Sequence, residues 1–164
     1  MKNLVSLLLF SIFFLDSYGQ TVSNAEYSKM LKGLLDHSVP EVSVTDISPN
    51  EKVIYLDARE INEYEVSHIQ SAIWVGYDQF QKSALKQVPK DSKIIVYCSV
   101  GYRSEKISEK LIKMGYKDVS NLYGGLFEWA NQEMTMVNDS NQTNSIHAYD
   151  KDWGKWVTKG TKVY

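Results

Sequence analysis

The sequence contains very little cysteine and histidine, which limits the kinds of site it can build. Its 164 residues include one cysteine, Cys98, and three histidines, His37, His68 and His147. A single cysteine cannot form a disulfide within the chain, so Cys98 is either a buried packing residue or a reactive thiol. Because these four residues are spread along the chain, we expect no metal site, and no resident cofactor is indicated.

The chain also lacks a strong charge of either sign. Lys and Arg number 18 and Asp and Glu number 20, which gives a formal net charge of −2 at pH 7. Both signs are scattered along the sequence. Nucleic acids and anionic membrane surfaces are bound through clustered Lys and Arg, so we expect neither as a partner.

Residues 1–19 have the three-part layout of a secretory signal peptide. Lys2 supplies a positive start, the run from Leu4 to Leu15 is mostly apolar, and Ser17 and Gly19 are small residues beside a cleavage position. A retained membrane anchor is the alternative, but the run is well short of the roughly 20 residues that span a bilayer. We therefore expect an exported protein, periplasmic or secreted, with no membrane insertion after cleavage.

After this segment, short apolar runs alternate with helical patterns. Residues 20–40 are expected to contain one amphipathic helix, because apolar residues from Tyr27 to Leu35 recur at helical spacing. Residues 42–47 then alternate as in a strand, and compact apolar runs predict buried strands at 53–56, 72–75, 94–97 and 119–122. Helical patterns lie at 60–66, 77–88, 104–114 and 126–134. This alternation predicts an α/β fold with a mostly parallel central sheet of about five strands and helices on both faces.

The last part of the chain has a different composition. Residues 137–145 are polar without apolar periodicity, which predicts a linker or exposed loop. Asn138 and Asn141 match the N-glycosylation acceptor pattern, which matters only in a eukaryotic secretory pathway. The expected organisation is one domain at 41–133, followed by a polar linker and tail at 134–164.

The tail itself is rich in aromatic residues from residue 147 to the end. Free in solution, so many aromatic side chains would be poorly soluble. We therefore expect the tail to pack back on the domain, with Trp153 and Trp156 mostly buried.

The loop after the strand at 94–97 carries the most specific signal. Ligands of open parallel sheets bind beyond the carboxyl ends of the strands, where Cys98 lies. The start of the next helix offers unpaired N–H groups and a positive dipole end. Gly101 lets successive N–H groups curl around one point, and Arg103 adds a permanent positive charge. These features predict a reactive Cys98 thiolate, in a binding loop of Ser99, Val100, Gly101, Tyr102, Arg103 and Ser104.

Four separated motifs resemble the rhodanese family. They are Asp57-x-Arg59, Glu63-Tyr64 followed by Ser67-His68-Ile69, Cys98-x-x-Gly101-x-Arg103-Ser104, and Gly124-Gly125-x-x-x-Trp129. The resemblance implies a rhodanese-like three-layer domain. Ser67, Gln70 and Ser71 replace the two glycines and the proline of the family pattern, and Ser99 stands where its thiosulfate enzymes carry a basic residue.

This resemblance implies a sulfurtransferase. Cys98 would take a sulfane sulfur from a donor, thiosulfate or another, as a persulfide and pass it to a thiophilic acceptor. The N–H groups of residues 99–103 would stabilise the bound sulfur. Asp57 and Arg59 would help to fix the site, the alternative being an ordinary ion pair at a strand end. The expected partners are a small sulfur donor and cyanide, a small thiol or a protein thiol as acceptor.

Two other functions share features with this loop. One is a non-enzymatic persulfide carrier or binding module on the same fold, although the retained Cys98 favours chemistry. The other is a cysteine phosphatase, which uses the same strand, loop and helix plan. Phosphatase loops resemble Cys-x5-Arg, whereas the spacing from Cys98 to Arg103 is one residue shorter. The shorter loop suits a single sulfur atom better than a phosphoryl group.

Overall fold

The computed structural model describes residues 21–139 and 141–164. The expected signal peptide and its cleavage position lie outside these residues. Within the described part of the chain, no helix has both the length and the apolar character needed to cross a membrane.

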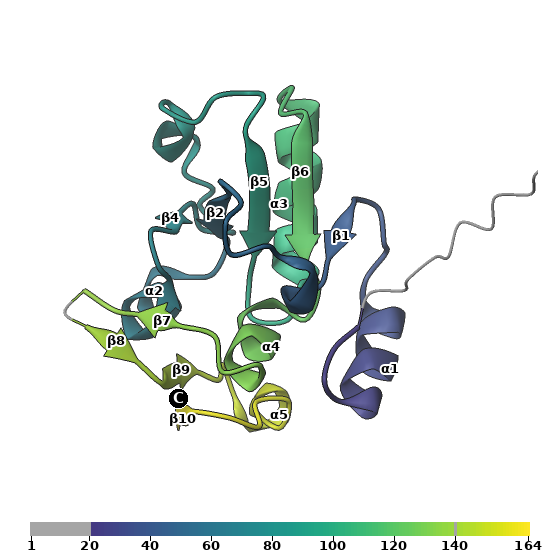
Figure 1. Ribbon diagram of the computed structural model, residues 1–164, viewed down its shortest axis with the longest axis vertical. Helices are drawn as coiled ribbons and strands as arrows, with labels where there is room; N and C mark the ends of the chain where they lie inside the picture. Colours follow the sequence, from purple (N-terminus) through teal and green to yellow (C-terminus); the bar gives the residue numbers. More distant parts are fainter. Residues whose placement is uncertain (1–20, 140) are drawn as a thin grey trace, which may run out of the picture.

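A five-stranded sheet forms the centre of the domain (Figure 1). Its order is β1-β6-β5-β2-β4, and every neighbouring pair is parallel. The strands are β1 (Glu41–Val42), β2 (Ile54–Asp57), β4 (Ile73–Trp74), β5 (Lys93–Tyr97) and β6 (Asp118–Leu122). The expected mostly parallel sheet of about five strands is confirmed.

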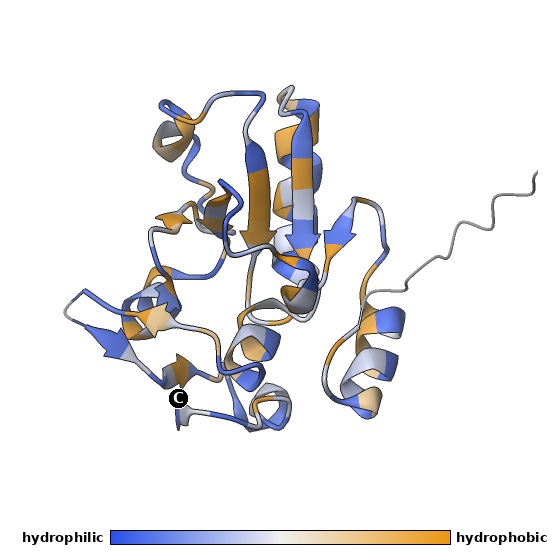
Figure 2. Ribbon diagram, in the orientation of Figure 1, coloured by the Kyte–Doolittle hydropathy of each residue, from blue (hydrophilic) through white to orange (hydrophobic). Residues whose placement is uncertain are grey.

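Helices cover both faces of this sheet. The helical elements are α1 (Ala25–Leu34), α2 (Ile61–Val66), α3 (Tyr102–Lys113), α4 (Gly125–Asn131) and the 3-10 turns η1 (Val44–Asp46) and η2 (Lys82–Leu85). Ile94 and Val96 of β5 belong to the apolar cluster that includes the inner face of α3. Ile95 and Tyr97 belong to a second cluster, with α1 and α4. Alternate side chains of one strand thus enter two cores, which is why β5 is apolar along almost its whole length (Figure 2).

Two of the expected elements are wrong. Residues 77–88 form only the short turn η2, not a helix. They follow Gly76, whose φ of +66° turns the chain, and Leu85 and Val88 reach the core without regular helical pairing. The strand-like alternation at 42–47 ends after β1, because the N–H of Asp46 bonds back to the carbonyl of Ser43 at 3.1 Å and closes η1.

The polar stretch at 137–145 is not a simple loop, as the sequence suggested. β7 (Met136–Val137) pairs antiparallel with both β3 (His68–Ile69) and β8 (Gln142–Thr143), and β9 (Ser145–His147) pairs with β10 (Thr161–Val163). Backbone hydrogen bonds form these short strands, and the polar side chains that follow them leave no apolar periodicity to detect.

The tail folds back over the domain and contains α5 (Lys151–Gly154). The ring of Trp156 stacks on Tyr27 of α1 with centroids 5.3 Å apart. Trp153 and Trp156 are both partly buried, and Tyr149 and Tyr164 are exposed. In Figure 1 the tail lies beside α4 and beyond the ends of β5 and β6, at the edge of the sheet where Cys98 is found.

Candidate active site

Cys98 lies directly beyond the carboxyl end of β5, at the start of the loop that leads into α3. The residue is only 1% exposed, yet it lines a pocket. Its Sγ accepts a hydrogen bond from the backbone N–H of Gly101 at 3.1 Å. Gly101 has a φ of +124°, a conformation that L side chains rarely adopt, so glycine is needed for this turn.

The first turn of α3 belongs to the same loop. The helix begins at Tyr102, and its first backbone bond runs from the N–H of Glu105 to the carbonyl of Gly101 at 3.0 Å. The N–H groups before Glu105 therefore precede the helical ladder, and the positive end of the helix dipole falls in the loop. This arrangement favours negative charge beside Sγ.

Asn121 of β6 anchors the loop to the sheet. The sequence analysis did not identify this residue. Its Nδ2 donates to the carbonyl of Gly101 at 3.0 Å, and its Oδ1 lies 2.7 Å from the hydroxyl of Ser104. All of these polar groups are buried. Ser104 therefore supports the loop and does not line the pocket. An asparagine near the carboxyl end of an expected buried strand is the signal that could have identified Asn121.

The start of α4 holds the other side of the loop. The N–H of Leu126 donates to the carbonyl of Cys98 at 2.8 Å, and that of Phe127 donates to the carbonyl of Ser99 at 3.0 Å. Gly125 makes this approach possible, since a Cβ there would lie 2.5 Å from the Cys98 carbonyl oxygen. The Gly-Gly motif and the cysteine loop are thus packed backbone to backbone.

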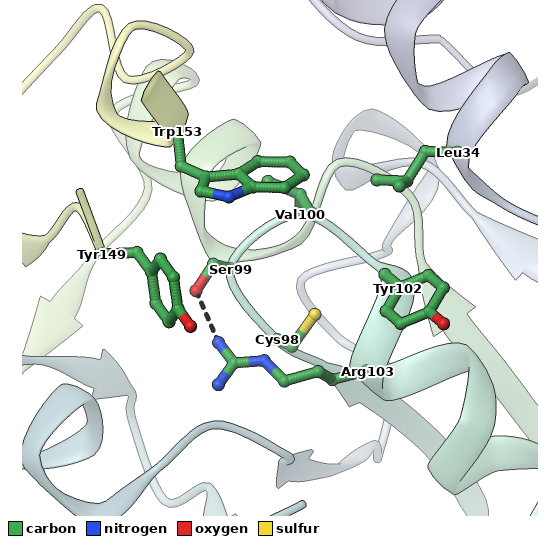
Figure 3. A pocket seen from close by; sticks show the side chains of 8 residues that line it. All are labelled: Leu34, Cys98, Ser99, Val100, Tyr102, Arg103, Tyr149 and Trp153. Carbon is green, nitrogen blue, oxygen red and sulfur yellow. Dashed lines mark hydrogen bonds between the residues drawn. The ribbon is translucent and has the colours of Figure 1, made fainter. Parts of the chain in front are cut away.

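Arg103 is paired with Glu63 of α2. Its Nη1 donates to Oε2 at 2.6 Å and its Nη2 to Oε1 at 2.7 Å, while the Ser99 hydroxyl also donates to Oε1 at 2.9 Å. Nη2 further bonds to the Ser99 hydroxyl oxygen at 3.0 Å (Figure 3). The predicted loop cation is present, but a carboxylate already faces it.

The environment of Glu63 keeps its carboxylate ionised. Burial raises its pKa, but the hydrogen bonds and charge of Arg103 outweigh burial and bring the pKa to about 2. A capping box at the start of α2 adds to this, because the N–H of Glu60 donates to Oε2 at 3.0 Å. Glu63 was part of a motif in the sequence, but its pairing with a residue 40 positions later was not predictable from it.

Asp57 and Arg59 form a separate, buried ion pair. The Arg59 Nη2 donates to Asp57 Oδ2 at 2.6 Å and to the carbonyl of Ser67 at 2.5 Å, and both side chains are fully buried. Burial alone would lower the pKa of Arg59. The charge and hydrogen bonds of Asp57 outweigh burial, so the pKa lies above its ordinary value. Neither residue lines the pocket at Cys98. The geometry is that of an ion pair fixing the strand end and the turn at Ser67.

His68 is packed within the fold. Its ring stacks on Tyr64 with centroids 3.8 Å apart, and its Nδ1 lies 3.0 Å from the carbonyl of the same residue. Among residues 21–139 and 141–164, no group of three or more His, Cys, Asp or Glu side chains is placed to hold a metal ion.

A pocket of about 270 Å³ opens above Cys98 (Figure 3). The loop contributes Cys98, Ser99, Val100, Tyr102 and Arg103, and the remaining lining residues are Leu34, Tyr149 and Trp153. These last three come from α1 and from the tail. Sequence reasoning placed them in a helix and a packed tail but missed them as site residues. The aromatic richness of the tail was the available signal.

The chain is similar in sequence or in fold to several known proteins. A tRNA uridine(34) hydroxylase of Sodalis glossinidius is 28% identical over 127 residues, covering 74% of this chain but 36% of its own length. The fold is similar to a rhodanese-like domain from Anabaena sp. (TM-score 0.56, 21% identity, 60% of this chain and 79% of that chain). It is also similar to a thiosulfate sulfurtransferase from Pseudomonas aeruginosa (TM-score 0.56, 18% identity, 80% and 25%).

The chain spans only about a third of the length of the first of these relatives. More than half of the chain, residues 42–132, matches the family described as Rhodanese-like domain. The chain therefore belongs to the rhodanese-like domain family.

Proposed function

We propose that this protein is a sulfurtransferase that carries sulfur as a persulfide on Cys98. One observation carries the proposal: Sγ sits at the start of α3, bonded to the N–H of Gly101 at 3.1 Å, and lines an open pocket. Backbone N–H groups at a helix start stabilise an anionic sulfur without a further side chain. A persulfide on Cys98 would extend that anion by one atom into the pocket.

The reaction has two half-steps. The Cys98 thiolate attacks the outer, sulfane sulfur of a donor, forming a new S–S bond while the donor's own S–S bond breaks and its remainder leaves with the electron pair. In the second half, an acceptor thiolate or cyanide attacks the terminal sulfur of the persulfide. The Cys98 thiolate leaves and is regenerated. The loop N–H groups are positioned to stabilise the negative sulfur between the two half-steps.

The pairing of Arg103 supports sulfur transfer over phosphate-ester hydrolysis. A phosphate dianion bound over Cys98 would need the guanidinium fork, which already donates to Glu63 at 2.6 and 2.7 Å. The phosphate would also lie near that ionised carboxylate and be repelled by it. A single sulfur atom needs no two-pronged contact with the Arg103 guanidinium.

The named function of the matched relative is RNA hydroxylation, and we carry over only the shared domain. The match covers 36% of that hydroxylase. The proposal for this chain therefore rests on its own Cys98 site. A persulfide carrier that depends on a dedicated partner protein is the second form this chemistry could take, and turnover with small molecules alone separates the two.

We also propose that the protein acts after export, on the strength of residues 1–19. The sulfur donor and acceptor would then be molecules available outside the cytoplasm. N-terminal sequencing of the protein isolated from its native host tests this point, since a start near residue 20 is expected.

Sulfur transfer is tested with a sulfane-sulfur donor plus cyanide, and in parallel with an aryl phosphate. Wild type should form thiocyanate, Cys98→Ser should not, and Arg103→Ala should be slower because the loop loses its tie to Glu63. Donor treatment without acceptor should add about 32 Da to wild type. Mild reduction should remove this added mass, whereas it would not remove the similar mass added by dioxidation of the thiol. Phosphate release that depends on Cys98, without thiocyanate formation, would overturn the proposal.

A further inference from the structure

Part of the pocket wall comes from segments outside the matched family region. Leu34 ends α1, and Tyr149 and Trp153 belong to the tail, whereas the family match covers residues 42–132. With Val100 and Tyr102 they place apolar and aromatic side chains around Sγ (Figure 3). Segments on both sides of the family match thus add an apolar wall to the pocket at Cys98.

These walls are held in place by partly buried polar contacts. Glu105, at the start of α3, accepts hydrogen bonds from the N–H groups of Asp36 and Ser38 at 3.1 and 2.9 Å, which fixes the chain just after Leu34. On the other side, Asn131 donates to the carbonyl of Trp156 at 2.9 Å. Such anchored walls pay little ordering entropy when a ligand enters.

Trp153 and Tyr149 are fixed locally as well. The N–H of Trp153 is capped by Asp150 Oδ1 at 2.9 Å, at the start of α5. The Tyr149 ring lies 5.7 Å from the Arg103 guanidinium, as a cation–π contact. The backbone of Trp153 and the ring of Tyr149 are therefore held beside the loop.

The pocket has almost no net charge to offer a ligand. Among the described residues that line it, Arg103 is the one cation, and its charge is matched by the ionised Glu63. A small dianion such as thiosulfate would meet an apolar wall and a neutralised cation. A monoanion with an organic group would place its negative sulfur against the loop N–H groups and its apolar part against the aromatic rings.

We propose that the pocket selects sulfane-sulfur donors that carry an apolar, aryl-sized organic group, namely organic thiosulfonates, over inorganic thiosulfate. This inference rests on the proposed sulfur transfer and names its substrate class. The Cys98 thiolate attacks the terminal sulfur of R–SO2–S⁻, the bond between the two sulfurs breaks, and the sulfinate R–SO2⁻ leaves with the electron pair. The negative charge is conserved, and no oxidant or reductant is consumed.

The test compares benzenethiosulfonate, methanethiosulfonate and thiosulfate as donors, with cyanide as the acceptor. The kcat/KM for each donor is measured for wild type, Trp153→Ala and Tyr149→Ala. Tyr164→Ala is the matched control, an exposed tail aromatic that does not line the pocket. The two thiosulfonates differ in intrinsic reactivity. We therefore take the ratio of kcat/KM for benzenethiosulfonate to kcat/KM for methanethiosulfonate, the benzene-to-methane ratio, and compare it between wild type and the variants.

We expect wild type to prefer benzenethiosulfonate over thiosulfate. Trp153→Ala and Tyr149→Ala should each lower the benzene-to-methane ratio by about five- to tenfold, mainly through KM for the aryl donor, because removed apolar contact lowers specificity by such factors. Tyr164→Ala should keep the wild-type ratio. Melting curves verify folding, and Tyr149, already exposed, gives a variant that does not disturb the core.

The outcomes separate the two proposals. If all variants turn over the donors but share one ratio, the aryl preference is overturned while sulfur transfer stands. A wild-type preference for thiosulfate over benzenethiosulfonate has the same meaning. If no donor gives turnover that depends on Cys98, both proposals are overturned.

Discussion

The carboxylate of Glu63 in α2 and the guanidinium of Arg103 in α3 form a two-pronged ion pair, with N–O distances of 2.6 and 2.7 Å. This ion pair joins α2 to α3. The residue after Arg103 is Ser104, whose hydroxyl bonds to Asn121 of the sheet. The α3 end of the cysteine loop is thus held from both α2 and the sheet. The position of the loop depends on Glu63 being ionised.

Stability at low pH follows from the pKa of Glu63. The folded-state pKa is about 2, lowered from 4.5. A group with a depressed folded-state pKa contributes stability above its unfolded-state pKa and loses that contribution as the pH falls through its folded-state pKa. Wild type should therefore lose free energy of unfolding between about pH 5 and pH 2, by no more than about 3 kcal/mol from this group.

The measurement is urea unfolding at pH 7 and pH 3 for wild type and Glu63→Gln. The variant should be less stable at pH 7, and the difference between wild type and variant should shrink at pH 3. Glu65→Gln, at an exposed position of the same helix, controls for the loss of a carboxylate. A difference that stays constant with pH would contradict this account.

The close packing of α4 on the cysteine loop predicts a strong effect of one methyl group. Gly125 has a φ of +56°, and a Cβ there would lie 2.5 Å from the carbonyl oxygen of Cys98 and 2.7 Å from backbone atoms of Ser99. Gly125→Ala must move the loop, so we expect a loss of roughly 2 kcal/mol or more in stability and a sharp fall in sulfur transfer.

Gly33→Ala is the matched control for this change. Gly33 lies inside α1, and a Cβ there meets no atom within 4 Å. Gly33 is in the last turn of α1, and alanine is favoured over glycine in a helix, so this variant should be more stable by up to about 0.5–1 kcal/mol and equally active. Melting temperatures that move in opposite directions support the packing argument, and a wild-type melting temperature for Gly125→Ala contradicts it.

Asn121 should matter for activity although it does not touch the pocket. Asn121→Ala removes the donor to the carbonyl of Gly101 and the acceptor of the Ser104 hydroxyl, both of which are buried. The Gly101 carbonyl still accepts from the N–H of Glu105 and from the Ser104 hydroxyl, so each lost hydrogen bond costs about 0.5–1.5 kcal/mol. Ser120→Ala, on the same strand, is the control. We expect Asn121→Ala to lower both the free energy of unfolding in urea and kcat. Wild-type kcat in a folded variant would show that the loop needs no anchor.

The elements whose apolar residues recur with a regular period were predictable from the sequence. The strands near 94–97 and 119–122 and the helix after Cys98 carry compact apolar runs or helical spacing, and each appears within a few residues of its expected bounds. The same periodicity misled at 77–88, where apolar residues reach the core from a turn. Apolar spacing records which side chains are buried and not how the backbone between them is bonded.

The site was predictable only where it is local in sequence. Cys98, Gly101 and the start of α3 lie within one short segment, so their chemistry could be inferred together. The partner of Arg103 comes from α2, and the pocket walls come from both ends of the chain. These contacts depend on tertiary packing, which no single motif encodes.

The contact between Trp156 and Tyr27 predicts that the tail stabilises the domain. Their rings stack at 5.3 Å with planes 16° apart, and Tyr27 is itself fully buried with its hydroxyl bonded to the carbonyl of Gly124 at 2.8 Å. Asn131 adds a second tie, since its Oδ1 accepts from the N–H of Thr158 at 2.7 Å. Loss of these contacts should expose one face of α1 and of α4.

Deleting residues 147–164 should therefore lower the melting temperature by several degrees. Trp156→Ala alone should account for a large part, because truncating a packed aromatic costs up to about 3 kcal/mol when its site is partly exposed. Tyr164→Ala, at the exposed end of the tail, should leave the melting temperature near that of wild type. If the deletion melts at the wild-type temperature, the tail contributes only the pocket wall at Cys98 and nothing to the stability of the fold.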